Sequence, residues 1–150
     1  MKSKSIRIYV DTNVLVNYCT GQQADVDALT YIFSKRRRET LFTSSLAIVQ
    51  TITQLQKSNK SRKALDRASV VELMNKLMAK FSVIDLSKND LNKGFAYENR
   101  DVEDSIHYAL CEKLKCDTIL TNNLSDFDYF KKIKKISPTM GLALIKMKIK

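Results

Sequence analysis

Residues 8–16 read IYVDTNVLV, a short apolar run that ends at Asp11 and is followed by a second apolar run. The β-branched and aromatic residues before Asp11 predict a strand over residues 5–10. Asp11, Thr12 and Asn13 favour a helix N-terminus, and the apolar residues after them predict the first turns of a helix. A strand that passes through an acidic residue directly into a helix is the unit from which we infer the fold.

The same alternation of strand and helix continues along the chain. Apolar residues at helical spacing predict further helices over residues 24–38, 45–57, 65–78, 88–97, 101–114 and 140–145. Short apolar runs predict strands over residues 41–43, 81–84, 118–120 and 133–136. Because such an alternation forms parallel sheets covered on both faces, we expect an α/β protein with a three-layer α/β/α sandwich and a central, mainly parallel sheet. No linker or repeat interrupts the pattern, so we expect a single domain over residues 1–150.

The composition excludes several classes of protein. Of the 150 residues, 44% are hydrophobic and 28% are charged, which is typical of a globular chain long enough to bury a core. No apolar run reaches the roughly 18 residues that span a bilayer, and the basic start lacks the apolar segment of a signal peptide. We therefore expect a cytoplasmic protein without a membrane partner. The three cysteines have no CxxC spacing, so we expect reduced thiols.

Basic residues are in excess and are unevenly distributed. The chain has 26 Lys and Arg against 16 Asp and Glu, a formal net charge of +10. One cluster is Lys35, Arg36, Arg37 and Arg38, and another is Lys57, Lys60, Arg62, Lys63 and Arg67. Residues 129–150 hold seven lysines, Lys131 and Lys132 among them, and no acidic residue. Such charge attracts polyanions, although a solvated surface or an acidic partner protein explains it equally well.

Acidic residues gather where two predicted strands end. Asp11 follows the first strand, Asp126 lies shortly after the strand over residues 118–120, and Asp101 and Asp104 open the helix before that strand. In a parallel sheet, sites form beyond the carboxyl ends of the strands. Oxygen ligands without histidine suit Mg²⁺ or Mn²⁺, which stabilise charge on a phosphodiester. The combination indicates nuclease chemistry, although capping a helix explains each acid taken alone.

Four segments together resemble the PIN-domain family. They are IYVDTNVLV at 8–16, LFTSSLAIVQ at 41–50, DVEDSIHYAL at 101–110 and TILTNNLSDF at 118–127, in the order and spacing of the family. The family fold is a three-layer α/β/α sandwich. The resemblance implies a divalent-metal-dependent endoribonuclease that cleaves single-stranded RNA, similar to the VapC-type toxins of toxin–antitoxin systems. It therefore implies RNA and an antitoxin protein as partners, and it leaves a homodimer open.

The resemblance also implies roles for particular residues. The catalytic acids and metal ligands would be Asp11, Asp104 and Asp126. The residues that support them would be Asn13, Gln50, Asp101, Thr121 and Asn123. The clustering of positive charge, and not the resemblance, predicts that Lys35, Arg36, Arg37, Arg38, Lys131 and Lys132 bind RNA. His107, a lone histidine one turn after Asp104, is expected to be structural, with a general-base role as the alternative.

The chain departs from the family at Gln50. Members usually carry an acid there, on the helix after the second strand, whereas an amide adds no charge to the site. A degenerate PIN domain that binds RNA with little or no cleavage is therefore one alternative, and an RNA-processing nuclease that is not a toxin is another. A receiver-type domain also has an aspartate after a strand, but it lacks the downstream TNNLSDF segment.

Overall fold

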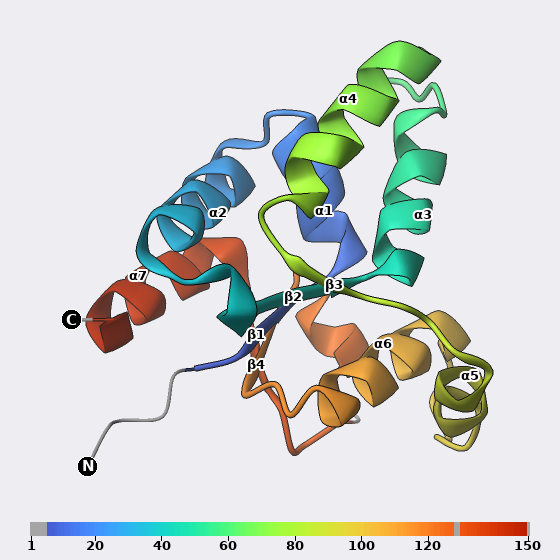
Figure 1. Ribbon diagram of the computed structural model, residues 1–150, viewed down its shortest axis with the longest axis vertical. Coiled ribbons are helices and arrows are strands. Elements are labelled where there is room, and N and C mark those ends of the chain that lie inside the picture. Colours follow the sequence, from blue (N-terminus) through green and yellow to red (C-terminus); the bar gives the residue numbers. More distant parts are fainter. Residues whose placement is uncertain (1–5, 128–129, 150) are drawn as a thin grey trace.

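The protein is built around a five-stranded sheet in which all neighbouring strands are parallel (Figure 1). The structure is a computed structural model that describes residues 6–127 and 130–149, with side chains up to residue 143. The strands lie in the order β3-β2-β1-β4-β5. They are β1 (Ile8–Val10), β2 (Leu41–Ser44), β3 (Ser82–Ile84), β4 (Thr118–Leu120) and β5 (Lys134–Ile136). β1 is therefore the central strand, with β2 and β3 on one side of it and β4 and β5 on the other.

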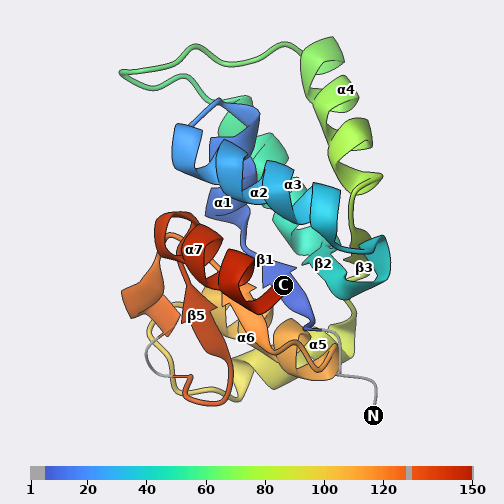
Figure 2. The same ribbon diagram turned by 90° about the vertical axis from the view of Figure 1, so that its left-hand side faces the viewer.

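Helices cover both faces of this sheet (Figures 1 and 2). One face is covered by α1 (Thr12–Cys19), α2 (Gln23–Lys35), α3 (Ser45–Leu55), α4 (Arg67–Met78) and α7 (Pro138–Ile149). The other face is covered by α5 (Lys88–Phe95) and α6 (Val102–Lys113). Two short 3-10 helices, η1 (Arg38–Thr40) and η2 (Leu124–Phe127), precede β2 and follow β4. The three layers of the expected α/β/α sandwich are confirmed.

Each face of the sheet has its own apolar core, because successive strand residues point to opposite faces. Ile8 and Val10 of β1 pack with the helices on the α1 side, and Tyr9 between them packs on the α6 side. Gly94 of α5 lies so close to α6 that an added Cβ would approach the Ile106 Cα to 2.9 Å. The absence of a side chain at Gly94 therefore lets α5 hold the first turns of α6 in place.

The expected elements are present, with shifted ends. α2 ends at Lys35 and not at residue 38, because Arg36 is extended and η1 leads into β2. α7 begins at Pro138, a residue suited to a helix start. The first residue expected in a strand, Ser5, and the side chains of residues 144–150 in the lysine-rich stretch lie outside the described part. Within that part no helix is long and apolar enough to cross a membrane, and the cysteines are unpaired.

Candidate active site

The candidate site lies at the carboxyl edge of the sheet, between the ends of β1 and β4. The connection after β1 leads to β2 on one side of it, whereas β4 pairs with β1 on the other side. In a parallel sheet a crevice forms where the strand order reverses in this way. The backbone N–H of Asp11, directly after β1, donates to the Leu120 carbonyl at 3.0 Å. Thr121 follows β4 at the same edge. Asp11 and Thr121 are thus brought together by the pairing of two strands that are far apart in sequence.

Asp11 is buried, and its carboxylate is held by hydrogen bonds on both oxygens. Its Oδ1 accepts from the Thr12 backbone N–H at 2.8 Å. Its Oδ2 accepts from the Asn13 side-chain amide and from the Thr121 hydroxyl, each at 2.8 Å. The side chain therefore caps α1 and has a fixed orientation. Asn13 and Thr121 lie where the sequence placed them, in contact with Asp11.

Asn13 also connects Asp11 to the segment after β4. Its side-chain carbonyl accepts from the backbone N–H of Asn122 at 2.9 Å and from the Asn122 amide at 3.1 Å. The Asn122 amide donates further to buried Asp25 of α2 at 2.8 Å. The Asn123 backbone N–H donates to the Thr121 hydroxyl at 3.0 Å. Asn122 and Asp25 were not identified from the sequence, because this contact depends on how α2 packs.

Asp104 has the least compensated carboxylate of the site. It lies in the first turn of α6, and its Oδ2 is buried without a hydrogen-bond partner among the described residues. Burial, and after it the charges of Asp101, Asp11, Asp126 and Glu103 in that order, together raise the pKa of Asp104 to about 7. Asp101 caps the helix by accepting from the Asp104 backbone N–H at 3.0 Å. Near neutral pH this group is therefore destabilised as an anion and would be stabilised by a cation.

Asp126 and Glu103 are exposed acidic residues that line the cavity together with buried Asp11 and Asp104. Asp126 is exposed in η2, and its position is fixed by Phe127, whose side chain is fully buried. Glu103 precedes Asp104 on α6 and is also exposed. Both residues line the same cavity as Asp11 and Asp104. Three separate segments of the chain thus direct carboxylates to one place.

Gln50 of α3 belongs to a partly buried hydrogen-bond network. Its side-chain carbonyl accepts from the Thr12 hydroxyl at 2.6 Å and pairs with Nε2 of His107 at 2.8 Å. Because an amide oxygen cannot donate, Nε2 of His107 carries the proton. Nδ1 of His107 then accepts from the Tyr9 hydroxyl at 2.7 Å, and Tyr9 also pairs with Ser44 at 2.7 Å. Every polar atom of the imidazole is satisfied in its neutral form.

This network explains the environment of His107. The side chain is 2% exposed, and burial lowers the pKa of His107, although the charge of Asp11 acts in the opposite direction. Its Nε2 lies 3.8 Å from Oδ1 of Asp11 and is occupied by Gln50. His107 is thus a neutral structural residue, as expected from the sequence. The role of Tyr9 was not predicted, because it was interpreted as an ordinary strand residue. Ser44 was expected only as a candidate cap of the next helix, which it is, and its contact with Tyr9 was not predicted.

The acids line a cavity of about 680 Å³ that α1 and α3 bound on the side away from the sheet. Its acidic residues are Asp11, Asp101, Glu103, Asp104 and Asp126, and its polar lining includes Asn13, Gln50 and Asn123. Within the described residues, no group of three or more acidic, histidine or cysteine side chains is already arranged as a metal site. The unpartnered Oδ2 of Asp104 and its four acidic neighbours nevertheless fit a hard divalent cation, because all the donors are oxygen atoms.

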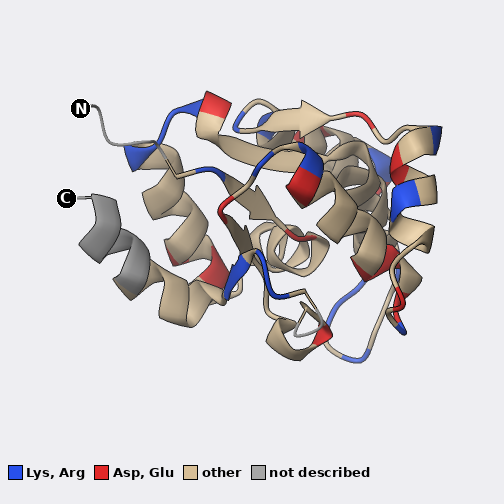
Figure 3. Ribbon diagram, turned by 90° about the horizontal axis from the view of Figure 1, so that it is seen from below, with Lys and Arg blue, Asp and Glu red and all other residues tan. Residues whose placement is uncertain are grey.

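The basic clusters that the sequence associated with RNA lie elsewhere. Lys35 ends α2 and Arg36 to Arg38 precede β2, while Lys131 and Lys132 precede β5. Residues directly before parallel strands lie at the amino edge of the sheet, opposite the cavity. The Arg36 guanidinium donates to the Ile6 carbonyl, and Nε of Arg38 donates to the Phe81 carbonyl at 2.9 Å. In the ribbon of Figure 3, acidic and basic residues are interspersed along the described chain.

Comparisons with known proteins agree with this architecture. The sequence model of the PIN domain matches residues 8–135. No curated protein sequence matches the chain. Among solved structures, the chain is similar to VapBC2 from Rickettsia felis bound to a DNA fragment from its promoter. The TM-score is 0.66 and the identity 13%, over 88% of this chain and 98% of that chain.

Two further structures have the same fold. One is VapC20 from Mycobacterium tuberculosis, described as a sarcin-ricin loop cleaving toxin, with a TM-score of 0.60 and 16% identity over 85% of this chain and 98% of that one. The other is PAE2754 from Pyrobaculum aerophilum, with a TM-score of 0.65 and 17% identity over 95% of this chain and 96% of that chain. At these identities the likeness establishes the fold.

Proposed function

This chain belongs to the PIN-domain family, and on that ground we propose that it is a divalent-metal-dependent nuclease that cleaves single-stranded RNA as the toxin of a toxin–antitoxin pair. The observation that carries the proposal is the buried carboxylate oxygen of Asp104, which has no hydrogen-bond partner in the described part of the chain and lies among four other acids. A buried charge without a partner destabilises the fold, and such groups are concentrated at functional sites.

The residues that would hold the metal are Asp11, Asp104 and Asp126, with Asp101 and Glu103 beside them. The chemistry that bound Mg²⁺ or Mn²⁺ supplies is stabilisation of charge on the phosphodiester and activation of water. The chain itself fixes the geometry: Asn13 and Thr121 orient Asp11, and Asp101 anchors the first turn of α6, on which Asp104 lies. Such supporting contacts keep ligands in place when the ion enters.

The proposed substrate and partner rest on the solved structures that share the fold. One of these is described as a toxin that cleaves the sarcin-ricin loop, and another is a VapBC assembly on promoter DNA. The net charge of +10 suits encounter with RNA or with an acidic partner protein. An antitoxin partner, a homodimer and a cytoplasmic location are parts of this proposal.

A second candidate function is RNA binding without cleavage. Gln50 favours it, because the amide carries no charge and its oxygen is already bound by His107 and Thr12. Three acids would then remain of the four that the family usually has. A nuclease of RNA processing without a toxin role would have the same site.

The experiment that separates these functions is incubation of the purified chain with a mixed pool of single-stranded RNA. The proposal predicts cleavage with Mg²⁺ or Mn²⁺, none with a chelator, and none by Asp104→Asn with either ion. Retention of intact RNA on the protein at every metal concentration would support the binding-only function. For the toxin role, the measurement is growth arrest on expression in a bacterial host, which Asp104→Asn should abolish.

A further inference from the structure

The cavity extends from the acids along a groove between α1 and α3. Its α3 wall consists of residues three or four apart, which therefore share one helix face: Leu46, Val49, Gln50, Thr53 and Gln54. Its α1 wall consists of Thr12, Asn13, Val16 and Asn17. We call this part of the cavity the α1–α3 groove. Both walls are uncharged, and most of their side chains are amides or hydroxyls that can hydrogen-bond to a ribose or a base.

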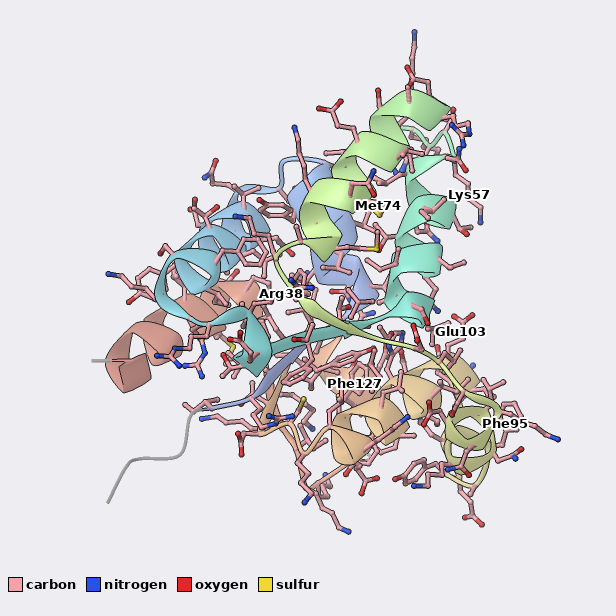
Figure 4. The ribbon with its side chains drawn as sticks, viewed as in Figure 1. Arg38, Lys57, Met74, Phe95, Glu103 and Phe127 are labelled. Atoms are coloured by element: carbon pink, nitrogen blue, oxygen red, sulfur yellow. The ribbon has the colours of Figure 1, made fainter. Side chains whose placement is uncertain are left out.

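Lys57 lies at the end of the groove away from the acids. Among the described residues that line the cavity it is the one Lys or Arg side chain. It follows Gln50 by seven residues, about 10 Å along the helix direction at 1.5 Å per residue. Figure 4 shows Lys57 and Glu103 on the same side of the molecule, near opposite ends of α3, with Arg38 away from both. The groove is thus acidic at one end and basic at the other.

Lys57 begins a basic connection between α3 and α4, residues 57–64, which we call the basic arm. It reaches away from the body of the molecule (Figure 2). No acidic residue occurs between Glu39 and Asp66 in the sequence. The guanidinium of Arg62 donates to the carbonyls of Gln54 and Leu55 at 2.9 and 3.2 Å. Arg62 therefore uses its charge to fix the arm to the end of α3, and the arm's lysines remain available.

Those lysines are Lys57, Lys60 and Lys63. Within the described residues, none of the three forms an ion pair or a side-chain hydrogen bond, and all three are exposed. The predicted RNA-binding arginines at the amino edge differ, since Arg36 and Arg38 donate to backbone carbonyls. Free ammonium groups next to a groove that leads to the acids are suited to bind successive phosphates of one strand.

We propose that the substrate strand lies in the α1–α3 groove, with its scissile phosphate at the acids and its neighbouring phosphates bound by the lysines of the basic arm. This inference rests on the proposed nuclease function, which requires a strand to reach the acids. An acidic protein segment would also be attracted by the lysines, but the five carboxylates at the other end of the groove disfavour it. A phosphodiester is drawn to that end by the cation that the acids hold under the proposed function.

The test compares two variants with the same loss of charge. The arm variant carries Lys57→Gln, Lys60→Gln and Lys63→Gln, and the control carries Lys35→Gln, Lys131→Gln and Lys132→Gln at the amino edge. Both are made in an Asp104→Asn background, so that the RNA stays intact. Binding of a labelled 20-nucleotide oligouridylate is measured by fluorescence anisotropy in Mg²⁺ over a series of salt concentrations.

The arm variant should lower the slope of log affinity against log salt by about 2, since each phosphate contact on a single strand contributes about 0.7. The control should keep the slope of the background protein, and among single substitutions Lys57→Gln should weaken binding most. Equal losses in the two variants, or a loss in the control alone, would overturn the proposal. So would an arm variant that binds the RNA normally but loses binding to polyglutamate, which would assign the arm to an acidic protein. Failure of the nuclease proposal appears separately, as absence of cleavage by the unmodified chain.

Discussion

At the carboxyl edge of the sheet five acidic side chains line one cavity, whereas at the amino edge the nearby charges are mostly basic and are used to hold the chain together. Arg36 and Arg38 bind backbone carbonyls there, and Arg7 donates through Nε to the Leu114 carbonyl at 2.9 Å. Asp104 at the carboxyl edge has a buried oxygen with no partner among the described residues. The guanidinium groups of Arg7, Arg36 and Arg38 therefore hold distant segments together, although Nε of Arg36 is also buried without a hydrogen-bond partner among the described residues. The Asp104 carboxylate makes no such bond through its buried oxygen, so its charge is retained at a cost to stability.

Whether the charged groups already have partners therefore indicates the functional site better than the density of charge along the sequence does. In the most basic cluster of the sequence, the guanidinium groups of Arg36 and Arg38 already donate to backbone carbonyls, and the acids lie where one carboxylate is uncompensated. A site that must bind a cation keeps its negative charge unpaired until the ion arrives. The two edges should consequently respond in opposite ways to substitution.

The largest expected effect is loss of cleavage in Asp11→Asn and in Asp104→Asn. Each substitution removes a charge from the proposed metal site while retaining the size of the side chain. The loss should be on the order of a hundredfold or more, because even residues that only support metal ligands contribute about 10–100-fold. The measurement is the rate of RNA cleavage in Mn²⁺, with the melting temperature as a check on folding.

Asp117→Asn is the matched control for these two variants, since Asp117 lies at the amino edge and accepts from the Arg7 backbone N–H at 2.8 Å. It should cleave at the rate of the unmodified chain. Wild-type rates in both carboxyl-edge variants would show that the site has been misplaced.

Gln50→Glu should have the next largest effect, a gain of about tenfold in Mn²⁺ affinity, or about 1.4 kcal/mol. A carboxylate there adds attraction for a dication, but His107 and Thr12 already bind this position and limit the gain. The new charge should also raise the pKa of His107, which NMR titration of its ring protons can follow. Calorimetry that gives equal affinities, together with an unchanged His107 titration, would mean that Gln50 does not face the site.

A smaller effect concerns stability and pH in the absence of metal. Because the pKa of Asp104 is raised from 3.8 to about 7 in the folded chain, its contribution to stability is lost as pH rises through that interval. Asp104→Asn should therefore melt at the same temperature as the unmodified chain near pH 4 and a few degrees above it at pH 8. The lowered pKa of His107 reduces stability as pH falls, but His107 is present in both proteins, so this effect cancels in the comparison. A difference that does not change with pH would argue against the buried anion.

The smallest expected effect lies at the amino edge. Arg38→Gln removes the hydrogen bond to the Phe81 carbonyl and should lower the free energy of unfolding by about 1 kcal/mol. RNA binding and cleavage should stay unchanged, because Arg38 is far from the cavity (Figure 4). Urea denaturation measures the free energy of unfolding, and the anisotropy and cleavage assays measure RNA binding and cleavage. If RNA affinity fell and stability did not, Arg38 would be an RNA-binding residue, as the sequence alone suggested.

Much of the fold was predictable, because its elements are short and their patterns are local. The run IYV before Asp11 predicted β1, and the apolar residues at 140–145 predicted a closing helix, which lies within the longer α7. The residues beside Asp11 were predicted through the resemblance to the PIN-domain family: Asn13 lies two residues after Asp11, and Thr121 directly follows β4. Their roles as ligands and supports of a metal remain predictions.

Contacts between distant segments could not be predicted in the same way. Tyr9 meets His107 across 98 residues, and Asn122 meets Asp25 across 97, through packing that no local pattern encodes. The position of the basic clusters could have been inferred from the order of elements, since Lys35 to Arg38 and Lys131 to Lys132 each precede a strand. The prediction that these clusters bind RNA rested on their density along the sequence and did not use their place at the amino edge of the sheet.

The central claim is that Asp104 is an uncompensated anion that a divalent cation stabilises. Its most direct test is the titration of the Asp104 side-chain carboxyl carbon by NMR, with and without Mg²⁺. The account predicts a pKa of about 7 without the ion, and with it a fall to the ordinary value of about 3.9 or lower. A pKa near 4 in both conditions, or one that Mg²⁺ leaves unchanged, would contradict the claim.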